Sequence, residues 1–388
     1  MAESGSSTGG GSAAPEAGTR GPIRGLEDVI AGETRISWVD GVNGLLIYNG
    51  YDIHELADKV LFGDVVHLLW HGDLPSPQQH KRFRSQLVSE MRLPSQVIQM
   101  IELAPDGAHP MDVLRTAVSA LSMFDPDSGD MSIEANERKS VRLLGQVMTI
   151  IADMHRVRSN RPVLSPDPKL DIAANFLYMF RGEPPDALEE QAFAHLLLLH
   201  ADHGFNASTF AARVTASTLA DMHAALCSAL GALKGPLHGG ANERVMHMLD
   251  EIDNVEEVDS YIEGMLNQGQ RIMGFGHRVY KVEDPRTRHL RRWSEELCRR
   301  SDMAHLYEIS HRIEEVVVAK KGIFPNVDFY SATVQHALGI PREYFTTIFA
   351  ASRTAGWLGH IMEQYADNRL IRPRSHYVGA WNRRIDPS

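Results

Sequence analysis

Hydrophobic residues recur along most of the chain at intervals of three and four positions, the spacing that places side chains on one face of a helix. Residues 111–121 and 141–151 each carry a series of four large apolar residues at this spacing. Residues 290–297 repeat it opposite an arginine-rich run at 285–292. Such a run is typical of a solvated helix face, although in an acidic protein it also suits a small polyanionic ligand. These segments predict amphipathic helices.

Local start signals support the same interpretation. Residues 76–79, Ser-Pro-Gln-Gln, form a capping box, in which the serine and the glutamine satisfy backbone N–H groups at a helix start. Asp186 and Glu189 form another. Alternating strand patterns are confined to residues 35–38 and 44–48, which predict one small hairpin. The sequence therefore predicts an all-α fold.

Small residues crowd one stretch of the chain, residues 207–233. It includes four alanines at strict four-residue spacing, Ala212, Ala216, Ala220 and Ala224. A face of small side chains allows helices to approach closely, which fits either packing within one subunit or a helical dimer interface. The sequence leaves both open.

Composition and charge exclude several classes of protein. The 388 residues are 43% hydrophobic and 23% charged, and the net charge is −11, whereas a general nucleic-acid binder is normally basic. No apolar run approaches the roughly 20 residues of a membrane span. Only two cysteines occur, Cys227 and Cys298, which favours a reducing compartment such as the cytoplasm. Residues 1–25, rich in Gly, Ser, Ala and Pro, predict a disordered tail without a secretory signal.

Several familiar motifs fail on inspection. Residues 274–276, Gly-Phe-Gly, begin like a dinucleotide fingerprint, but Val279 stands where the third glycine is required. His200 and His203 are spaced like a metal pair on a helix, yet the chain has no HExxH motif and no supporting ligand set. A zinc hydrolase is therefore disfavoured, and no metal site is expected.

Three glycine- or proline-bounded segments place ionisable residues off the helix faces. They are residues 235–243, 274–278 and 325–329, and they carry His238, His277 and Asp328. Because a helical stretch follows Asp328, the helix dipole is expected to help keep its carboxylate ionised. One carboxylate base and two histidine donors suit proton abstraction next to a carbonyl group, with the developing enolate held by hydrogen bonds.

These segments, in this order, resemble the citrate synthase family. The resemblance extends from about residue 36 to 374 and includes landmarks at residues 36–41, 51–53 and 109–115. One departure is Asn49, where the family pattern has arginine.

The resemblance implies condensation of acetyl-CoA with oxaloacetate through an enol, followed by hydrolysis of the citryl thioester. Asp328 would be the base that removes a methyl proton from acetyl-CoA. His238 would hydrogen-bond the thioester oxygen, and His277 would polarise and protonate the oxaloacetate carbonyl. The alternatives are 2-methylcitrate synthase, which uses propionyl-CoA, and a catalytically silent helical scaffold. One extra methylene changes specificity by only about 1–3 kcal/mol, so no motif decides between the two acyl groups.

The resemblance also implies binding residues. His203, Arg286, Arg353 and Arg372 would hold oxaloacetate, and Arg372 would reach over from the partner subunit. The CoA contacts would be Gly274, Phe275, Gly276, Arg271, Lys281, Lys320 and Lys321.

The implied architecture is a large helical domain, residues 26–239 and 340–388, interrupted by a smaller helical domain, residues 240–339. The implied assembly is a homodimer whose active site the partner chain completes. Acetyl-CoA would be a substrate, and no cofactor or metal is implied. Nucleic acid and membrane are not expected as partners, and the expected location is cytoplasmic.

Overall fold

The computed structural model describes residues 23–26 and 29–385 and divides the chain into two units. One unit comprises the terminal segments, residues 1–33 and 372–388, and the other comprises residues 34–371. Residues 1–22 of the predicted tail lie outside the described residues. The tail's last residues enter a short 3-10 turn, η1 (Arg24–Leu26).

Helices dominate the described residues, so the predicted fold class is confirmed. The α-helices are α1 (Ile53–Ala57), α2 (Phe62–His71), α3 (Pro77–Glu90), α4 (Ser95–Glu102), α5 (Pro110–Leu121), α6 (Ile133–Arg158), α7 (Ile172–Arg181), α8 (Ala187–His200), α9 (Ala207–Ala216), α10 (Met222–Leu233), α11 (Ala241–Leu249), α12 (Val258–Asn267), α13 (Thr287–Arg300), α14 (Ala304–Lys321), α15 (Val327–Ala337) and α16 (Phe345–Ala366). Two further 3-10 turns are η2 (Val255–Glu257) and η3 (Arg342–Tyr344). Both predicted capping boxes are present, at the starts of α3 and α8.

The predicted hairpin forms and gains a third strand. Strands β1 (Ser37–Asp40), β2 (Leu45–Tyr48) and β3 (Tyr51–Asp52) pair antiparallel in sequence order. Asn49 and Gly50 make the turn between β2 and β3 with φ angles of 43° and 87°. Asparagine and glycine tolerate this left-handed backbone, so Asn49, the departure from the family pattern, suits the turn it occupies.

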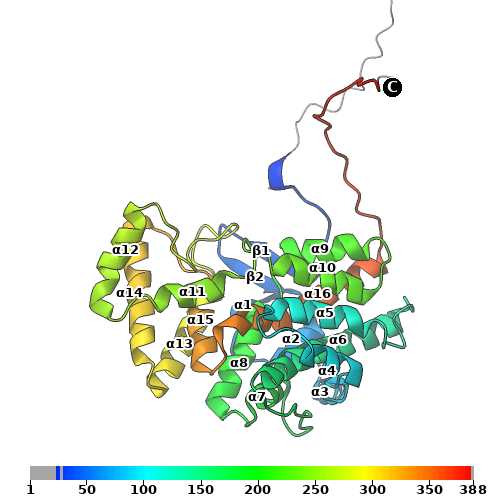
Figure 1. Cartoon of the computed structure of the whole chain (residues 1–388), viewed down its shortest axis with the longest axis horizontal. Coiled ribbons are helices and arrows are strands. Elements are labelled where there is room, and N and C mark those ends of the chain that lie inside the picture. Colours follow the sequence, from blue (N-terminus) through cyan, green and yellow to red (C-terminus); the bar gives the residue numbers. More distant parts are fainter. Residues whose placement is uncertain (1–22, 27–28, 386–388) are drawn as a thin grey trace, which may run out of the picture. The chain divides into compact units, whose positions relative to one another are not determined.

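A long and largely buried helix of the core, α16, positions much of the site. It packs on α2, α6, α8, α9 and α10, and most of its residues are buried. Figure 1 shows it between α8 and the α9–α10 pair. Gly356 allows the closest approach: a Cβ there would lie 2.3 Å from Asp202 Oδ1 and 2.5 Å from the Ala201 carbonyl oxygen. The helix is therefore locked against the end of α8.

The alanine series does not form one continuous face. α9 ends at Ala216 and α10 begins at Met222, so Ala220 lies in the connection between them. The four-residue period continues across a helix boundary that periodicity alone does not reveal. Ala212 and Ala216 are buried, and α9 packs on α10, which provides the close approach within the chain.

Helices α11 to α15 pack against one another and gather on one side of the 34–371 unit (Figure 1). The apolar stripe predicted for residues 290–297 is buried on α13. The predicted domain boundaries after residues 239 and 339 stay predictions. In the described part of the chain, no helix has the length and apolar character needed to cross a membrane.

Candidate active site

Two of the three glycine- or proline-bounded segments are bound to each other by their backbones. The N–H of Gly276 donates to the carbonyl of Phe324 at 2.9 Å, and that of Asn326 donates to the carbonyl of Gly274 at 2.8 Å. The Asn326 side chain adds a bond to the carbonyl of Gly276 at 2.8 Å. Gly274 has a φ of +78°, and a Cβ there would lie 2.9 Å from the Phe329 side chain. His277 and Asp328 are therefore held on adjoining segments.

Asp328 is the second residue of α15, and its carboxylate is suited to act as a base. The Asn326 side chain caps the helix by accepting from the Asp328 N–H at 3.0 Å. Oδ1 of Asp328 is buried and has no hydrogen-bond partner among the described residues. Burial raises the pKa of Asp328 to about 6, while Arg286 opposes this rise. The stabilisation expected from the helix dipole is thus outweighed by burial, which makes the group a stronger base.

His277 is a neutral imidazole with a defined tautomer. Its Nδ1 accepts hydrogen bonds from the backbone N–H groups of Val279 and Tyr280, each at 3.0 Å. Burial lowers its pKa to about 4, so the single ring proton sits on Nε2. The rings of His277 and His203 lie 5.3 Å apart, edge to face. His203 Nε2 lies 3.2 Å from the Tyr280 hydroxyl, and burial keeps the His203 pKa well below its ordinary value.

His238 shows the opposite tautomer. Its Nε2 lies 2.8 Å from the Ser208 hydroxyl and accepts from the Ser208 backbone N–H at 3.3 Å. A nitrogen that accepts from a backbone donor carries no proton, so the ring proton sits on Nδ1. Burial lowers the His238 pKa to about 4. His238 and His277 thus each offer one N–H donor at neutral pH.

The predicted carboxylate-binding arginines differ in how they are paired. Arg286 is buried, and its fork is engaged by Asp284, with Nε–Oδ1 at 2.9 Å and Nη2–Oδ2 at 2.6 Å. Asp284 Oδ2 also accepts from the Val327 N–H at 3.3 Å, which links this pair to the start of α15. Asp284 uses two of the five guanidinium N–H groups, so Arg286 has the two at Nη1 and one at Nη2 to offer a ligand.

Arg353 is buried on α16 without a carboxylate partner among the described residues. Its Nε donates to the carbonyl of His200 at 2.6 Å, and its guanidinium lies 4.7 Å from the Phe349 ring centre. Burial lowers the Arg353 pKa to about 10, which still leaves it charged at neutral pH. Because Arg353 forms no ion pair within the described part of the chain, its buried charge favours an anionic ligand, since pairing offsets the cost of removing the charge from water.

The site residues lie within one electrostatic neighbourhood. The charge of Arg353 contributes to lowering the pKa values of His203, His238 and Asp328. The charge of Arg286 contributes in the same way at His203, His277 and Asp328. Asp328 and the three histidines keep partial solvent access, whereas both arginines are 2% exposed. The structure therefore brings together the carboxylate, the histidines and two of the arginines.

Comparison with known proteins identifies the family. The family profile described as "Citrate synthase, C-terminal domain" matches residues 25–374. Citrate synthase 2 of Bacillus subtilis is 46% identical over 365 residues, which cover 94% of this chain and 98% of that protein. The chain belongs to the citrate synthase family.

Other members of the citrate synthase family carry more specific names. The citrate synthase of Thermoplasma acidophilum, solved as a ternary complex with carboxymethyl coenzyme A and oxaloacetate, matches at a TM-score of 0.89 and 33% identity, covering 94% of this chain and 98% of that one. The citrate/2-methylcitrate synthase of Bacillus subtilis is 40% identical and covers 92% of this chain and 96% of that protein. The relative named for both activities is thus less similar in sequence than citrate synthase 2 of Bacillus subtilis, at 40% against 46% identity.

The predicted CoA-binding residues are not gathered as tightly as the predicted catalytic residues. Gly274, Phe275 and Gly276 lie on the segment bound to residues 324–326, and the Phe275 and Phe329 rings are 4.7 Å apart. The four basic candidates, Arg271, Lys281, Lys320 and Lys321, are exposed.

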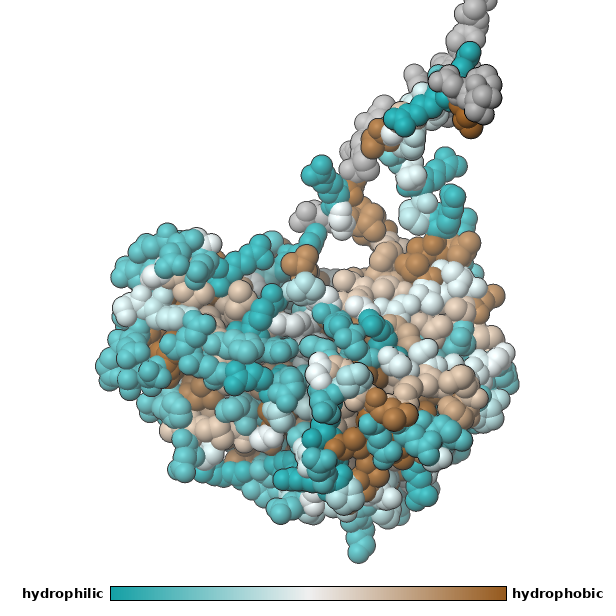
Figure 2. All heavy atoms as spheres, in the orientation of Figure 1, coloured by the Kyte–Doolittle hydropathy of each residue, from teal (hydrophilic) through white to brown (hydrophobic). Residues whose placement is uncertain are grey.

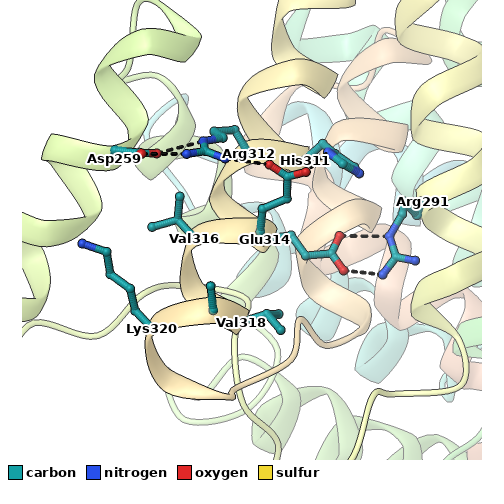
Figure 3. A pocket seen from close by; sticks show the side chains of 10 residues that line it. Asp259, Arg291, His311, Arg312, Glu314, Val316, Val318 and Lys320 are labelled. Atoms are coloured by element: carbon teal, nitrogen blue, oxygen red, sulfur yellow. Dashed lines mark hydrogen bonds and ion pairs between the residues drawn. The ribbon is translucent and has the colours of Figure 1, made fainter.

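Lys320 lines a separate concavity on the outer side of α12 and α14. Its ammonium pairs with Glu263 at 3.1 Å, and the concavity has a volume of about 710 Å³. Figure 3 shows Arg312 paired with Asp259 along its wall. No predicted catalytic residue lines it. Arg372 belongs to the unit of terminal segments, whereas the other predicted site residues belong to the 34–371 unit.

His200 and His203, the two histidines spaced like a metal pair, do not lie on one helix. α8 ends at His200, and His203 follows outside it. His200 Nδ1 instead contacts the carbonyl of Leu196 at 2.8 Å, and burial lowers the His200 pKa to about 3. Among the described residues, no group of three or more His, Cys, Asp or Glu is placed to hold a metal ion.

Sequence reasoning missed several residues that shape the site. Ser208, Tyr280 and Trp357 contact histidines or their partners, yet each appears in the sequence as an ordinary polar or core residue. Sequence reasoning also gave no role to Asp284, the partner of Arg286. A signal for it existed, because an acid two positions before an arginine predicted to bind an anion is a natural partner for the guanidinium.

Proposed function

We propose that the protein condenses acetyl-CoA with oxaloacetate and hydrolyses the citryl thioester to citrate and CoA. The observation that carries the proposal is a carboxylate with a raised pKa that shares the charges of Arg286 and Arg353 with two neutral imidazoles of fixed tautomer. Arg353 is buried and pairs with no carboxylate among the described residues. A base with a pKa near the operating pH and donors aimed at a developing oxyanion are what enol formation from a thioester needs.

Each group has a distinct role in the proposed reaction. Asp328 takes a proton from the methyl group of acetyl-CoA, and the Nδ1–H of His238 donates to the thioester oxygen as negative charge develops there. The enol carbon then attacks the oxaloacetate carbonyl, whose oxygen receives a proton from Nε2 of His277. Arg353 and Nη1 of Arg286 bind the oxaloacetate carboxylates, and His203 hydrogen-bonds the same substrate. The CoA moiety contacts residues 274–276 and the exposed cations.

A thiol-release assay tests the proposal. The purified protein is expected to release CoA only when acetyl-CoA and oxaloacetate are both present. Asp328→Ala is expected to lower kcat by a factor of about 10²–10⁴, the usual contribution of a general base. The matched control is Asp259→Ala, which removes a carboxylate that pairs with Arg312 on the outer surface. The absence of CoA release from the wild-type protein would favour a silent scaffold.

The second candidate is 2-methylcitrate synthase, since one relative is named for both activities. The two reactions share every step, so only the acyl pocket separates them. We expect kcat/KM to be higher for acetyl-CoA than for propionyl-CoA, because the relative named for citrate synthase is more similar. A clear preference for propionyl-CoA would reverse the assignment.

A homodimer is part of the same proposal. Three large apolar side chains are exposed to solvent, at a cost in hydration free energy: Met123 (74%), Leu219 (59%) and Leu370 (58%). They come from neighbouring parts of the 34–371 unit, because α5 packs on α10 and the Asn368 side chain donates to the Ser217 carbonyl at 3.2 Å. Figure 2 shows pale and hydrophobic residues over α9 and α10, whereas α12 and α14 are covered by hydrophilic ones. A second copy of the chain would cover this face.

Subunit mixing tests whether the partner supplies Arg372. Asp328→Ala and Arg372→Ala chains are each expected to be nearly inactive alone. In a mixed dimer, one site carries both lesions and the other carries neither. Random association should therefore restore about a quarter of the wild-type activity. No recovery from dimers shown to exchange would place Arg372 in its own subunit's site, and full activity of the Arg372→Ala chain alone would place it outside both sites.

The remaining parts of the proposal concern cofactors and location. Because Asp328 and the two histidines account for the proton transfers of the condensation and water is the only further reactant in the hydrolysis, the proposed reaction uses no cofactor or metal beyond its two substrates. A cytoplasmic location is consistent with the unpaired thiols of Cys227 and Cys298.

A further inference from the structure

A buried tryptophan completes a chain of hydrogen bonds to His238. The indole N–H of Trp357 donates to the Ser208 hydroxyl oxygen at 3.1 Å, and the same oxygen lies 2.8 Å from His238 Nε2. Trp357 is fully buried. It stands one helical turn after Arg353 on α16, the helix that Gly356 locks against α8. The indole donor is therefore held in place by the core.

The direction of the chain follows from the backbone. Ser208 N–H donates to His238 Nε2, which makes this nitrogen an acceptor. With a lone pair on Nε2 only 2.8 Å from the hydroxyl oxygen, the favourable arrangement directs the hydroxyl proton to Nε2. Asn206 Oδ1, 2.7 Å from the same hydroxyl, competes for that proton. It already accepts from the N–H groups of Ser208 and Thr209 as the cap of α9.

We infer that Trp357 is a positioning residue for His238 and acts through Ser208. The indole donor occupies a lone pair of the hydroxyl oxygen and makes the hydroxyl a stronger donor to Nε2, since hydrogen bonds in series polarise one another. Nδ1–H of His238 then becomes a stronger donor to the thioester oxygen. This inference rests on the proposed function, in which His238 stabilises the enol.

Trp357→Phe tests the inference, because it keeps a large aromatic side chain and removes the N–H. We expect kcat to fall about two- to tenfold, the range for one hydrogen bond, with the KM for oxaloacetate unchanged. The matched control is Trp70→Phe. Trp70 donates its indole N–H to the Ala355 carbonyl on the same helix at 2.9 Å, without contact to His238. The control should keep the wild-type kcat.

A double-mutant cycle separates a route through Ser208 from general loosening of the core. If Trp357 acts through the hydroxyl, Trp357→Phe should have no further effect on kcat in the Ser208→Ala background. Independent, multiplying effects would overturn the inference. So would equal kcat values for Trp357→Phe and Trp70→Phe.

A spectroscopic measurement on the wild-type protein covers the case in which Trp357→Phe does not fold. In ¹⁵N-histidine-labelled protein, His238 is expected to show a proton on Nδ1 and none on Nε2. A proton on Nε2 would overturn the inference without any variant at Trp357. Absence of CoA release from the wild-type protein would instead reject the proposed function, so the two failures are distinguishable.

Discussion

Asp328→Asn should remove activity and at the same time stabilise the folded protein at neutral pH. The raised pKa of Asp328 means that the folded state disfavours its charge. A rise from the ordinary 3.8 to about 6 corresponds to about 3 kcal/mol, at about 1.4 kcal/mol per pKa unit. Because the carboxylate keeps some solvent access, we expect a gain of about 1–2 kcal/mol.

The sign of the pH dependence follows from linkage. Below about pH 4 the carboxyl is protonated in both the folded and the unfolded protein, so its ionisation costs nothing. Between about pH 4 and pH 6 the unfolded chain ionises first, and the folded protein loses stability relative to it. Above about pH 6 Asp328 is ionised in both states, and the loss of folding stability caused by its buried charge has reached its full value. The advantage of Asp328→Asn should therefore grow from pH 4 to pH 6 and then remain constant.

Urea denaturation at fixed protein concentration between pH 5 and pH 8 measures this effect. The matched control is Asp284→Asn, which changes a neighbouring carboxylate in the same way. Asp284 is paired with Arg286, which helps to hold its pKa below the ordinary value, so its loss leaves a buried guanidinium uncompensated. The control should lose about 3–5 kcal/mol. Equal destabilisation of both variants at pH 8 would refute the argument from burial.

Three further predictions concern activity. As the pH falls, kcat/KM should decrease with a midpoint near pH 6, because Asp328 must be ionised to act as a base. His238 and His277 are neutral above about pH 5 and should not contribute to this decrease. A midpoint near pH 4 would contradict the raised pKa of Asp328. Gly274→Ala should lower both kcat and thermal stability, because the added Cβ would collide with the side chain of Phe329, which follows Asp328. The control Gly269→Ala has a similar φ but open space around it, so it should lower stability alone. Dialysis against EDTA should leave CoA release unchanged, and activity that returns only with zinc would revive the hydrolase alternative.

Several features of the fold could be predicted from local sequence. Helix starts at residues 76 and 186 follow from side chains that bond to backbone groups two or three positions away. The hairpin at residues 35–48 follows from the alternation of apolar and polar residues, which is also a local signal. The alanine series at 212–224 shows the limit of this approach, because a period continues through a turn whenever the turn contains a small residue at the right position. Where α9 ends depends on its packing against α10 and α16.

What the sequence determined by itself was the fold class and the family, and the proposed reacting groups rest on it. Apolar spacing specifies helices, and the order of His238, His277 and Asp328 among glycines and prolines specifies a family. The tertiary structure decided the state of those groups: the proton positions on the two imidazoles, the raised pKa of Asp328 and the burial of Arg353 without an ion pair among the residues described. The physical reason is that these properties depend on burial and on partners far apart in the chain. Trp357 and Ser208 are separated by 149 residues and meet only because α16 crosses α9 in the core.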